Sequence, residues 1–193
     1  MRYHETEIKL KVLNPRAVQR RLADLGFVIL KRRHFERNFL FDFPDSRLRK
    51  SSSVIRLRQE GRRSLLTFKG APHRSLDYKI RPEIETEVAD GGHMREILEA
   101  LGLRETFCYE KFRTIHSPAR RRGTPTVGLV MFDETPIGNF LELEGPRRWI
   151  DEVARQLGFS RADYISASYV SLYHAKCLDE GQEPGGMVFT ARQ

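Results

Sequence analysis

The stretch from Tyr3 to Val12 reads Tyr-His-Glu-Thr-Glu-Ile-Lys-Leu-Lys-Val, and its pattern decides the fold class. Charged residues occupy every second position from Glu5 onward, and the positions between them become apolar from Ile8. A period of two is typical of a β-strand with one charged face and one apolar face. The sequence therefore predicts a strand here whose charged face needs an explanation.

The residues that follow predict helices between further strands. Asn14-Pro15 supplies an N-cap and a proline at the first helical position, and Gly26 ends the helix that they begin. Strand pairs separated by helices indicate an α+β domain with a largely antiparallel sheet. Further helices are expected at 92–102, 147–157 and 165–177, and further strands at 36–43, 54–60, 64–69, 78–88, 107–116, 127–134 and 139–145.

Nearly every expected strand repeats the alternation of charge. The helices are amphipathic and need apolar partners, so we expect them to cover the apolar strand faces from outside. The charged faces then point inward, and an antiparallel sheet that closes in this way is a barrel with a polar lumen. The charges expected in this lumen are the acids Glu5, Glu7, Glu83, Glu85, Glu87, Asp133, Glu142 and Glu144, and the bases Lys9, Lys11, Arg56, Arg58, Lys69, Arg81, Lys111 and Arg113.

These lumen charges predict a particular ligand chemistry. Acids dominate the first and last strands and bases the middle ones. Paired carboxylates repel each other unless a cation lies between them, and Mg²⁺ and Mn²⁺ prefer carboxylate oxygens. Clustered arginine and lysine side chains bind phosphate. A single Glu-x-Glu-x-Lys stretch is usually a solvated strand face, but the combined pattern predicts a site for a metal–polyphosphate complex.

Composition narrows the class of protein further. The 193 residues include 34 Lys and Arg against 26 Asp and Glu, a net charge of +8 that allows nucleic acid, an anionic membrane surface or a small polyanion as partner. The charged N-terminus and the absence of an apolar run of about 18 residues argue against a secretory signal or a membrane span. Cys108 and Cys177 lack disulfide-framework or zinc-site spacing. We expect a cytoplasmic protein without membrane association.

The ordered motifs resemble the CYTH superfamily, the triphosphate tunnel metalloenzymes, which include class IV adenylate cyclases and thiamine triphosphatases. Glu5-Thr6-Glu7-Ile8-Lys9 is similar to the family's ExExK signature, and the resemblance covers about residues 3–175. Phe39–Arg58 and Phe132–Gly145 are most similar to the bacterial class IV cyclase branch. The other motifs are Arg56-x-Arg58, Thr67-x-Lys69-Gly70, Arg81-x-Glu83-x-Glu85, Glu110-Lys111-x-Arg113, Asp133, Gly138-x-x-x-Glu142-x-Glu144 and Ser168-Tyr169-x-x-Leu172.

The resemblance implies an eight-stranded antiparallel barrel that forms a triphosphate tunnel, with helices outside. It implies Mg²⁺ or Mn²⁺ as cofactor, with Asp133 as a further metal ligand or catalytic acid and Glu85 as a ligand of a second metal. Lys111 would bind phosphate or activate water as a catalytic residue. The implied main metal ligands are Glu5, Glu7, Glu142 and Glu144, and the implied triphosphate-binding residues are Lys9, Arg56, Arg58, Lys69, Lys111 and Arg113.

The resemblance further implies a metal-dependent enzyme that cleaves an organic triphosphate. The first candidate is a class IV adenylate cyclase, which converts ATP to cyclic AMP and pyrophosphate. The alternative is a phosphohydrolase acting on thiamine triphosphate, a nucleoside triphosphate or inorganic tripolyphosphate. Both reactions use the same tunnel and differ in the nucleophile, which the sequence does not identify.

Two functions other than catalysis remain compatible with the sequence. The basic loops allow a nucleic-acid-binding module, although inward-facing bases are closed to a duplex, so we do not expect a nucleic acid partner. A catalytically silent nucleotide or polyphosphate sensor could have the same sequence. We expect one domain over residues 1–178 and a disordered tail over 179–193, with solvated basic loops at 31–33 and within 117–126. A homodimer is left open.

Overall fold

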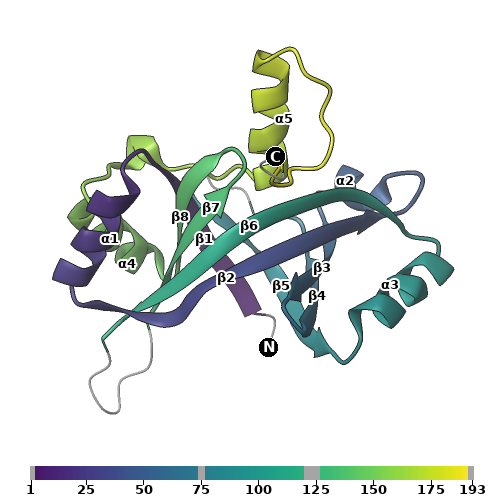
Figure 1. Cartoon of the computed structure of the whole chain (residues 1–193), viewed down its shortest axis with the longest axis horizontal. Coiled ribbons are helices and arrows are strands. Elements are labelled where there is room, and N and C mark those ends of the chain that lie inside the picture. The colour runs from purple at the N-terminus through teal and green to yellow at the C-terminus, as the bar shows by residue number, and fades with distance from the viewer. Residues whose placement is uncertain (1–2, 74–76, 120–126, 191–193) are drawn as a thin grey trace.

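The computed structural model describes residues 3–73, 77–119 and 127–190, and its strands form a closed antiparallel barrel (Figure 1). The order around the barrel is β1-β5-β4-β3-β2-β6-β7-β8, so the first and last strands pair and close it. The predicted α+β class and eight-stranded barrel are therefore confirmed. The strands are β1 (Tyr3–Val12), β2 (Phe27–Asp42), β3 (Val54–Glu60), β4 (Arg63–Lys69), β5 (Lys79–Val88), β6 (Arg104–Pro118), β7 (Leu129–Thr135) and β8 (Gly138–Glu144).

The helices lie outside the barrel, as the alternation predicted. Figure 1 shows α1 and α4 together at one end, α3 at the other, and α5 projecting from the barrel wall. Within the described part of the chain, no helix has the length and apolar character needed to cross a membrane. The helices are α1 (Pro15–Asp24), α2 (Arg47–Lys50), α3 (Gly91–Ala100), α4 (Arg147–Gln156) and α5 (Tyr169–Asp179), with a 3₁₀ turn at Arg161–Asp163.

Helix α1 begins and ends where the sequence predicts. The Asn14 side chain accepts a hydrogen bond from the backbone N–H of Ala17 at 3.1 Å, which satisfies one of the free donors at the helix start. Gly26 follows the helix with a φ of +78°, a conformation that favours glycine. The chain can therefore turn sharply from α1 into β2.

Three apolar clusters join strands to helices; two of them cover the outer strand faces, and a third joins Tyr109 and Phe140 to Tyr169 of α5. The first joins the outer faces of β1, β7 and β8 to α1 and α4, with Leu10, Leu22 and Ile150 fully buried. The second joins β2 and β3 to α3 through Phe41 and Leu98. Because the outer faces are covered, the charged faces are left to line the interior.

Ile150→Ala is expected to lower the free energy of unfolding by about 3 kcal/mol, since it removes a fully buried side chain from the first core. Urea unfolding followed by circular dichroism measures this change. Arg148→Ala, an exposed substitution on the same helix, is the control and is expected to change stability by less than about 0.5 kcal/mol. Equal losses in both variants would contradict the assignment of this core.

The structure differs from the sequence expectations in the length of β2 and in the place of the basic run 31–33. The predicted strand at 36–43 is the end of a much longer strand, β2, and the basic run 31–33 lies within β2 instead of in a loop. Register shifts between Ile29 and Lys31 and between Lys31 and His34 let the irregular half of β2 pair with β6. The basic run 120–122 lies outside the described residues, while Ser117 and Pro118 end β6.

The C-terminal segment is ordered as far as residue 190, whereas disorder was expected from residue 179. The Met187 side chain is fully buried, and its backbone N–H donates to the carbonyl of Cys108 at 3.0 Å. The backbone N–H of Glu110 donates to the Met187 carbonyl at 2.9 Å, so the segment runs beside β6 as a short parallel bridge. Figure 1 shows the chain returning from α5 to the barrel.

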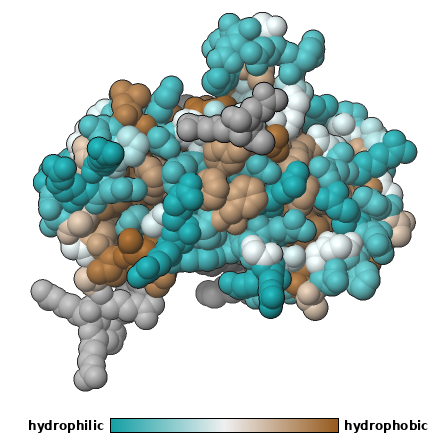
Figure 2. Space-filling view, viewed as in Figure 1, coloured by the Kyte–Doolittle hydropathy of each residue, from teal (hydrophilic) through white to brown (hydrophobic). Residues whose placement is uncertain are grey.

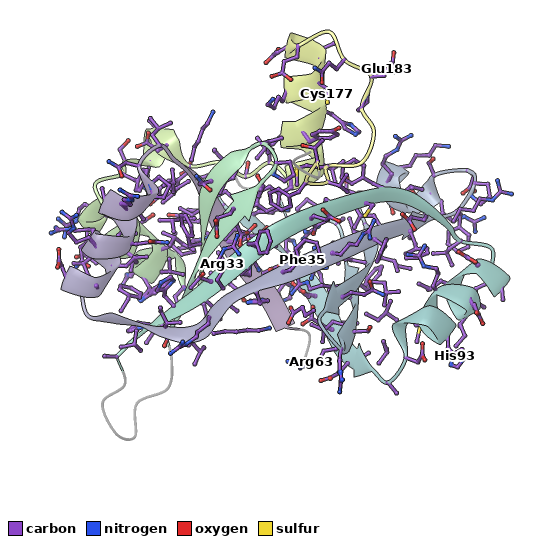
Figure 3. The ribbon with its side chains drawn as sticks, in the orientation of Figure 1. Arg33, Phe35, Arg63, His93, Cys177 and Glu183 are labelled. Carbon is purple, nitrogen blue, oxygen red and sulfur yellow. The ribbon has the colours of Figure 1, made fainter. Side chains whose placement is uncertain are left out.

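One patch of the outer barrel surface remains partly apolar. Figure 2 shows apolar side chains near the middle of the view, where Figure 1 places β2 and β6. Phe35 is 38% exposed, and its ring lies 5.3 Å from that of Phe112. The guanidinium of Arg33 covers the Phe112 ring at 3.5 Å, and Figure 3 shows Arg33 beside Phe35 on the front ribbon. These contacts shield part of the patch from solvent.

Candidate active site

The inward faces of the strands enclose a cavity of about 710 Å³, which we call the lumen cavity. Every site residue predicted from the sequence lines it, except Asp133. These lining residues come from strands that are distant in the sequence, and barrel closure brings them together. They are Glu5, Glu7, Lys9, Arg56, Arg58, Lys69, Glu85, Lys111, Arg113, Glu142 and Glu144.

Carboxylates from β1 and β8 form the acidic wall of the lumen cavity. In the strand register Glu7 lies opposite Glu144, and like charges in that arrangement destabilise a sheet. Burial and the charge of Glu7 raise the pKa of Glu5 to about 8, and the same causes raise the pKa of Glu144. Burial therefore disfavours the charged forms of Glu5 and Glu144, whereas Lys9 and Lys79 hold the pKa of Glu7 well below its usual range despite its burial. A divalent cation bound at this wall would favour the charged forms of all three carboxylates.

Basic side chains reach across the lumen to these carboxylates. The Lys69 ammonium lies 2.7 Å from Glu5 and 2.8 Å from Glu83. Lys79, which the sequence did not single out, lies 3.2 Å from Glu7. Acids and bases are therefore interleaved, whereas the sequence predicted that they would be separated on opposite sides.

The two arginines of β3 are held by several weaker contacts. Arg56 Nη2 donates to Thr67 Oγ1 at 3.2 Å and to Glu85 Oε2 at 3.3 Å. Arg58 Nε donates to the side-chain oxygen of Asn38 at 3.2 Å. Both guanidinium groups line the lumen cavity and retain further N–H donors that can bind an anion.

Asp133 lies opposite Arg113 in the strand register and is fully buried in the barrel interior. Its carboxylate accepts hydrogen bonds from Lys111 at 3.0 Å and from Arg113 through two N–H groups at 2.6 Å. The Tyr169 hydroxyl donates to the same carboxylate at 2.8 Å, and Arg113 also pairs with Glu142. Asp133 thus fixes the positions of two lumen bases.

The model of a known family, the CYTH domain, matches residues 3–169, a range that includes all of these lumen residues. The chain belongs to the CYTH family.

Relatives of this CYTH domain cover nearly its full length. A protein of Methanocaldococcus jannaschii named "Putative adenylate cyclase MJ0240" is 29% identical over 172 residues, which cover 87% of this chain and 97% of the relative. A structure from Vibrio parahaemolyticus with the same description has a TM-score of 0.75 at 20% identity, covering 89% and 98% of the two chains. The HpAC1 protein of Hippeastrum, whose description reports a dominant triphosphatase activity, has a TM-score of 0.61 at 20% identity, covering 93% and 97%. These two structures support the fold alone.

Two charges that the sequence assigned to the lumen of this CYTH barrel lie outside it. Lys11 is exposed at the end of β1, beyond the lumen cavity. Glu87 is exposed at the end of β5 and pairs with Arg63 at 2.7 Å on the outer surface, where Figure 3 labels that arginine. Because strands twist and end at the rim, strict alternation overcounts the lumen at its edges.

Glu36 is a central residue of the CYTH barrel that sequence reasoning missed. Its side chain is 1% exposed and lies between three cations, with Lys111 at 3.6 Å, Arg58 at 3.7 Å and Arg113 at 4.0 Å. The alternation Phe35-Glu36-Arg37-Asn38-Phe39 places it on the inner face, and that signal was available in the sequence. Glu36 therefore supplies, like Asp133, a buried negative charge to the lumen bases.

Tyr169 was noted in the sequence only as part of a C-terminal motif. It is buried at the start of α5, and its ring lies 5.3 Å from the ammonium groups of both Lys9 and Lys111. No periodicity within α5 indicates this placement, because it depends on how α5 docks on the barrel.

A separate group of possible metal ligands lies near Glu36 in the CYTH barrel. Within the described residues, the group with donor atoms within 4.8 Å of one another consists of His34, Glu36 and Glu60. Glu60 already pairs with Lys31, and Arg58 lies 3.4 Å from it. These cations occupy the carboxylates, so the group is better described as an ion-pair network than as a metal centre.

Proposed function

We propose that this CYTH barrel binds an organic triphosphate in the lumen cavity and cleaves it with the help of Mg²⁺ or Mn²⁺. The observation that carries the proposal is one cavity in which guanidinium and ammonium groups that can bind phosphate are interleaved with the carboxylates of β1 and β8. A metal–triphosphate complex supplies the matching charges, because its cation suits the carboxylates and its phosphates suit the bases.

The carboxylate wall fits a divalent cation. Burial, and secondly the charge of Glu7, raise the pKa values of Glu5 and Glu144, and a bound cation would offset both effects. With Glu142, these three carboxylates would hold the metal, which when bound supplies positive charge to phosphate oxygens during bond cleavage. Glu85, at the rim of the cavity, is the candidate for a second metal.

Binding of a metal–triphosphate complex would replace the lysine–glutamate ion pairs of the lumen with carboxylate–metal and lysine–phosphate pairs. Lys9 lies 3.5 Å from Glu7 and 3.4 Å from Glu142, and Lys69 pairs with Glu5. When the carboxylates turn to a metal, these ammonium groups become free to bind phosphate oxygens. Arg56, Arg58 and Arg113 would add bidentate contacts.

Lys111 and Asp133 have separate roles in this proposal. Lys111 lies between Asp133 at 3.0 Å and Glu36 at 3.6 Å, and these two carboxylates fix the position of its side chain. We therefore assign it to holding the phosphate or the leaving group rather than to activating water. Asp133, enclosed by its donors, is a positioning residue rather than a metal ligand.

The first candidate reaction is that of an adenylate cyclase. The ribose 3′-hydroxyl of ATP attacks the α-phosphorus, and the bond to the β-phosphate oxygen breaks, releasing pyrophosphate and leaving cyclic AMP. The description of the M. jannaschii relative supports this choice. The Hippeastrum description supports the second candidate, in which water attacks the γ-phosphorus and releases phosphate.

Product analysis decides between these reactions. The protein is incubated with ATP, thiamine triphosphate or tripolyphosphate, each with Mg²⁺ or Mn²⁺. Cyclic AMP with pyrophosphate identifies the cyclase, and free phosphate with a diphosphate identifies the phosphohydrolase. Triphosphate binding without turnover would identify a sensor, and tight nucleic-acid binding with a steep salt dependence and no triphosphate binding would contradict the proposal.

Arg58→Ala is expected to weaken tripolyphosphate binding by about tenfold or more, because it removes charge-assisted hydrogen bonds to phosphate. Isothermal titration calorimetry measures the dissociation constant. Arg63→Ala is the matched control, since Arg63 lies on the outer surface and pairs with Glu87 (Figure 3). Unchanged affinity in the Arg58 variant would count against a phosphate role for β3.

A further inference from the structure

Tyr109 is a lumen residue to which the proposed function assigns no role. It is buried, lines the lumen cavity and lies on β6 two residues before Lys111. Alternate residues of a strand share a face, so the phenol and the Lys111 ammonium lie on the same side of β6. In the strand register Tyr109 lies opposite Asn38, whose side-chain oxygen accepts a hydrogen bond from Arg58. The phenol therefore lies among the bases that are proposed to bind phosphate.

The charged groups that face the Tyr109 hydroxyl are cations. Burial alone would raise the pKa of this phenol, but the charges of Arg56, Lys111 and Arg58 lower it below the usual value. The contact from α5 is the ring of Tyr169 at 6.3 Å, which carries no charge. Nearby positive charge stabilises a phenolate, so the surroundings of Tyr109 make it a better proton donor than an ordinary phenol.

The other tyrosines whose side chains the structure describes differ from Tyr109 in this respect. Burial and the carboxylate of Asp151 raise the pKa of Tyr78 to about 12. Burial and the charge of Asp133 raise the pKa of Tyr169, whose hydroxyl donates to that carboxylate. Guanidinium and ammonium groups only donate hydrogen bonds, and among the described residues the Tyr109 hydroxyl proton has no acceptor. This proton is therefore available to a ligand in the lumen cavity.

We propose that Tyr109 is the general acid that protonates the leaving phosphate oxygen when the triphosphate is cleaved. This inference rests on the proposed function and adds a catalytic residue to it. Lys111, two residues away on the same face, is the residue assigned above to the phosphate or the leaving group, so the phenol lies beside that group. Both candidate reactions break a bond between phosphorus and a phosphate oxygen, and the role is the same in each.

The protons and electron pairs balance in this step. The attacking hydroxyl or water forms a bond to phosphorus and releases its proton to solvent. The bond from phosphorus to the leaving oxygen breaks, its electron pair stays on that oxygen, and the oxygen takes the proton of the Tyr109 hydroxyl. Arg56, Arg58 and Lys111 stabilise the phenolate that is left, which regains a proton from water.

Tyr109→Phe is expected to lower triphosphate turnover by about 100-fold, because it removes the proton donor and keeps the ring. Turnover of ATP, thiamine triphosphate and tripolyphosphate with Mg²⁺ or Mn²⁺ is measured across neutral and alkaline pH. A general acid must be protonated, so wild-type turnover is expected to fall as the pH rises, with a midpoint below about 10. This fall is expected to be absent in the variant, while its tripolyphosphate affinity in EDTA at neutral pH stays within about threefold of the wild type.

Ultraviolet absorbance of the ligand-free protein follows the ionisation of its phenols directly. The phenol that ionises at the lowest pH is expected to disappear in Tyr109→Phe. Tyr173→Phe is the matched control, because Tyr173 lies on α5, does not line the lumen cavity, and has its pKa raised by a hydrogen bond with Cys177. This control is expected to keep both the early ionisation and the wild-type turnover.

Three results would overturn the acid role while the proposed function stands. They are wild-type turnover in Tyr109→Phe, an alkaline fall with the same midpoint in the variant, and a loss of tripolyphosphate affinity as large as the loss of turnover. The last result would make Tyr109 a phosphate-binding residue instead of an acid. Absence of turnover by the wild-type protein would overturn the proposed function, and the acid role with it.

Discussion

Glu7→Gln and Glu144→Gln are each expected to lower metal-dependent triphosphate turnover by about 1000-fold, equivalent to about 4 kcal/mol of transition-state stabilisation. These carboxylates lie opposite each other in the pairing of β1 with β8, in the acidic wall of the lumen cavity. Each substitution keeps the size of the side chain and removes its negative charge, so the wall loses its ability to hold a divalent cation. Turnover of ATP with Mg²⁺ or Mn²⁺ measures the effect.

The fold is expected to survive these two substitutions. Glu7 pairs with Lys79, and burial lowers the pKa of Lys79 to about 8. A lysine that loses its proton so readily can become neutral when its partner is removed, which limits the cost of leaving it in the barrel. The control is Glu87→Gln on the outer surface, and thermal unfolding is followed for all variants. Full turnover in both lumen variants would contradict the metal role of this wall.

The barrel could be predicted from the sequence because charged and apolar residues alternate along its strands, and this pattern can be recognised within a single strand. Glu5, Glu7 and Lys9 share one face of β1 whatever surrounds them, and the same rule places Glu142 and Glu144 on β8. The amphipathic helices then fix which face is inside. Every predicted site residue except Asp133 lines the cavity for this reason.

Other features depend on tertiary pairing, which no local pattern encodes. The first half of β2 runs Phe27-Val28-Ile29-Leu30-Lys31-Arg32-Arg33, with no period of two, and it becomes a strand by pairing with β6 through register shifts. Met187 follows two glycines and has no periodic neighbours, and it is ordered because β6 offers it backbone partners. Asp133 shares the inner face with Arg113, but the four hydrogen bonds that enclose its carboxylate come from β6 and α5, and no local pattern indicates them.

Glu36 is expected to have two opposite effects. It stabilises the ligand-free barrel, and it weakens the binding of phosphate in the lumen cavity. Burial alone would raise the pKa of this carboxyl, but the charges of Lys111 and Arg113 hold it well below its usual range. It is therefore an anion at neutral pH, and it occupies the same cations that the phosphates of a ligand would use. Under the proposed function, Glu36 would therefore compete with a bound triphosphate for these cations.

Glu36→Gln is expected to lower the free energy of unfolding of the ligand-free protein by about 3 kcal/mol, because Lys111, Arg58 and Arg113 lose a buried counter-charge. The same change is expected to raise tripolyphosphate affinity by about tenfold, since the phosphates no longer compete with an internal carboxylate. Thermal unfolding with and without tripolyphosphate measures both effects. The variant is expected to have the lower Tm without ligand and the larger increase in Tm when ligand is added.

The combination of these two changes is what distinguishes a competing anion from an ordinary structural carboxylate. A carboxylate that only supported the fold would lower Tm equally with and without tripolyphosphate. Glu134→Gln is the control, because Glu134 pairs with Arg33 on the outer surface at 2.7 Å and touches none of the lumen bases. A smaller ligand-induced increase in Tm for Glu36→Gln than for the wild type would mean that Glu36 orients the bases for phosphate instead of competing with it.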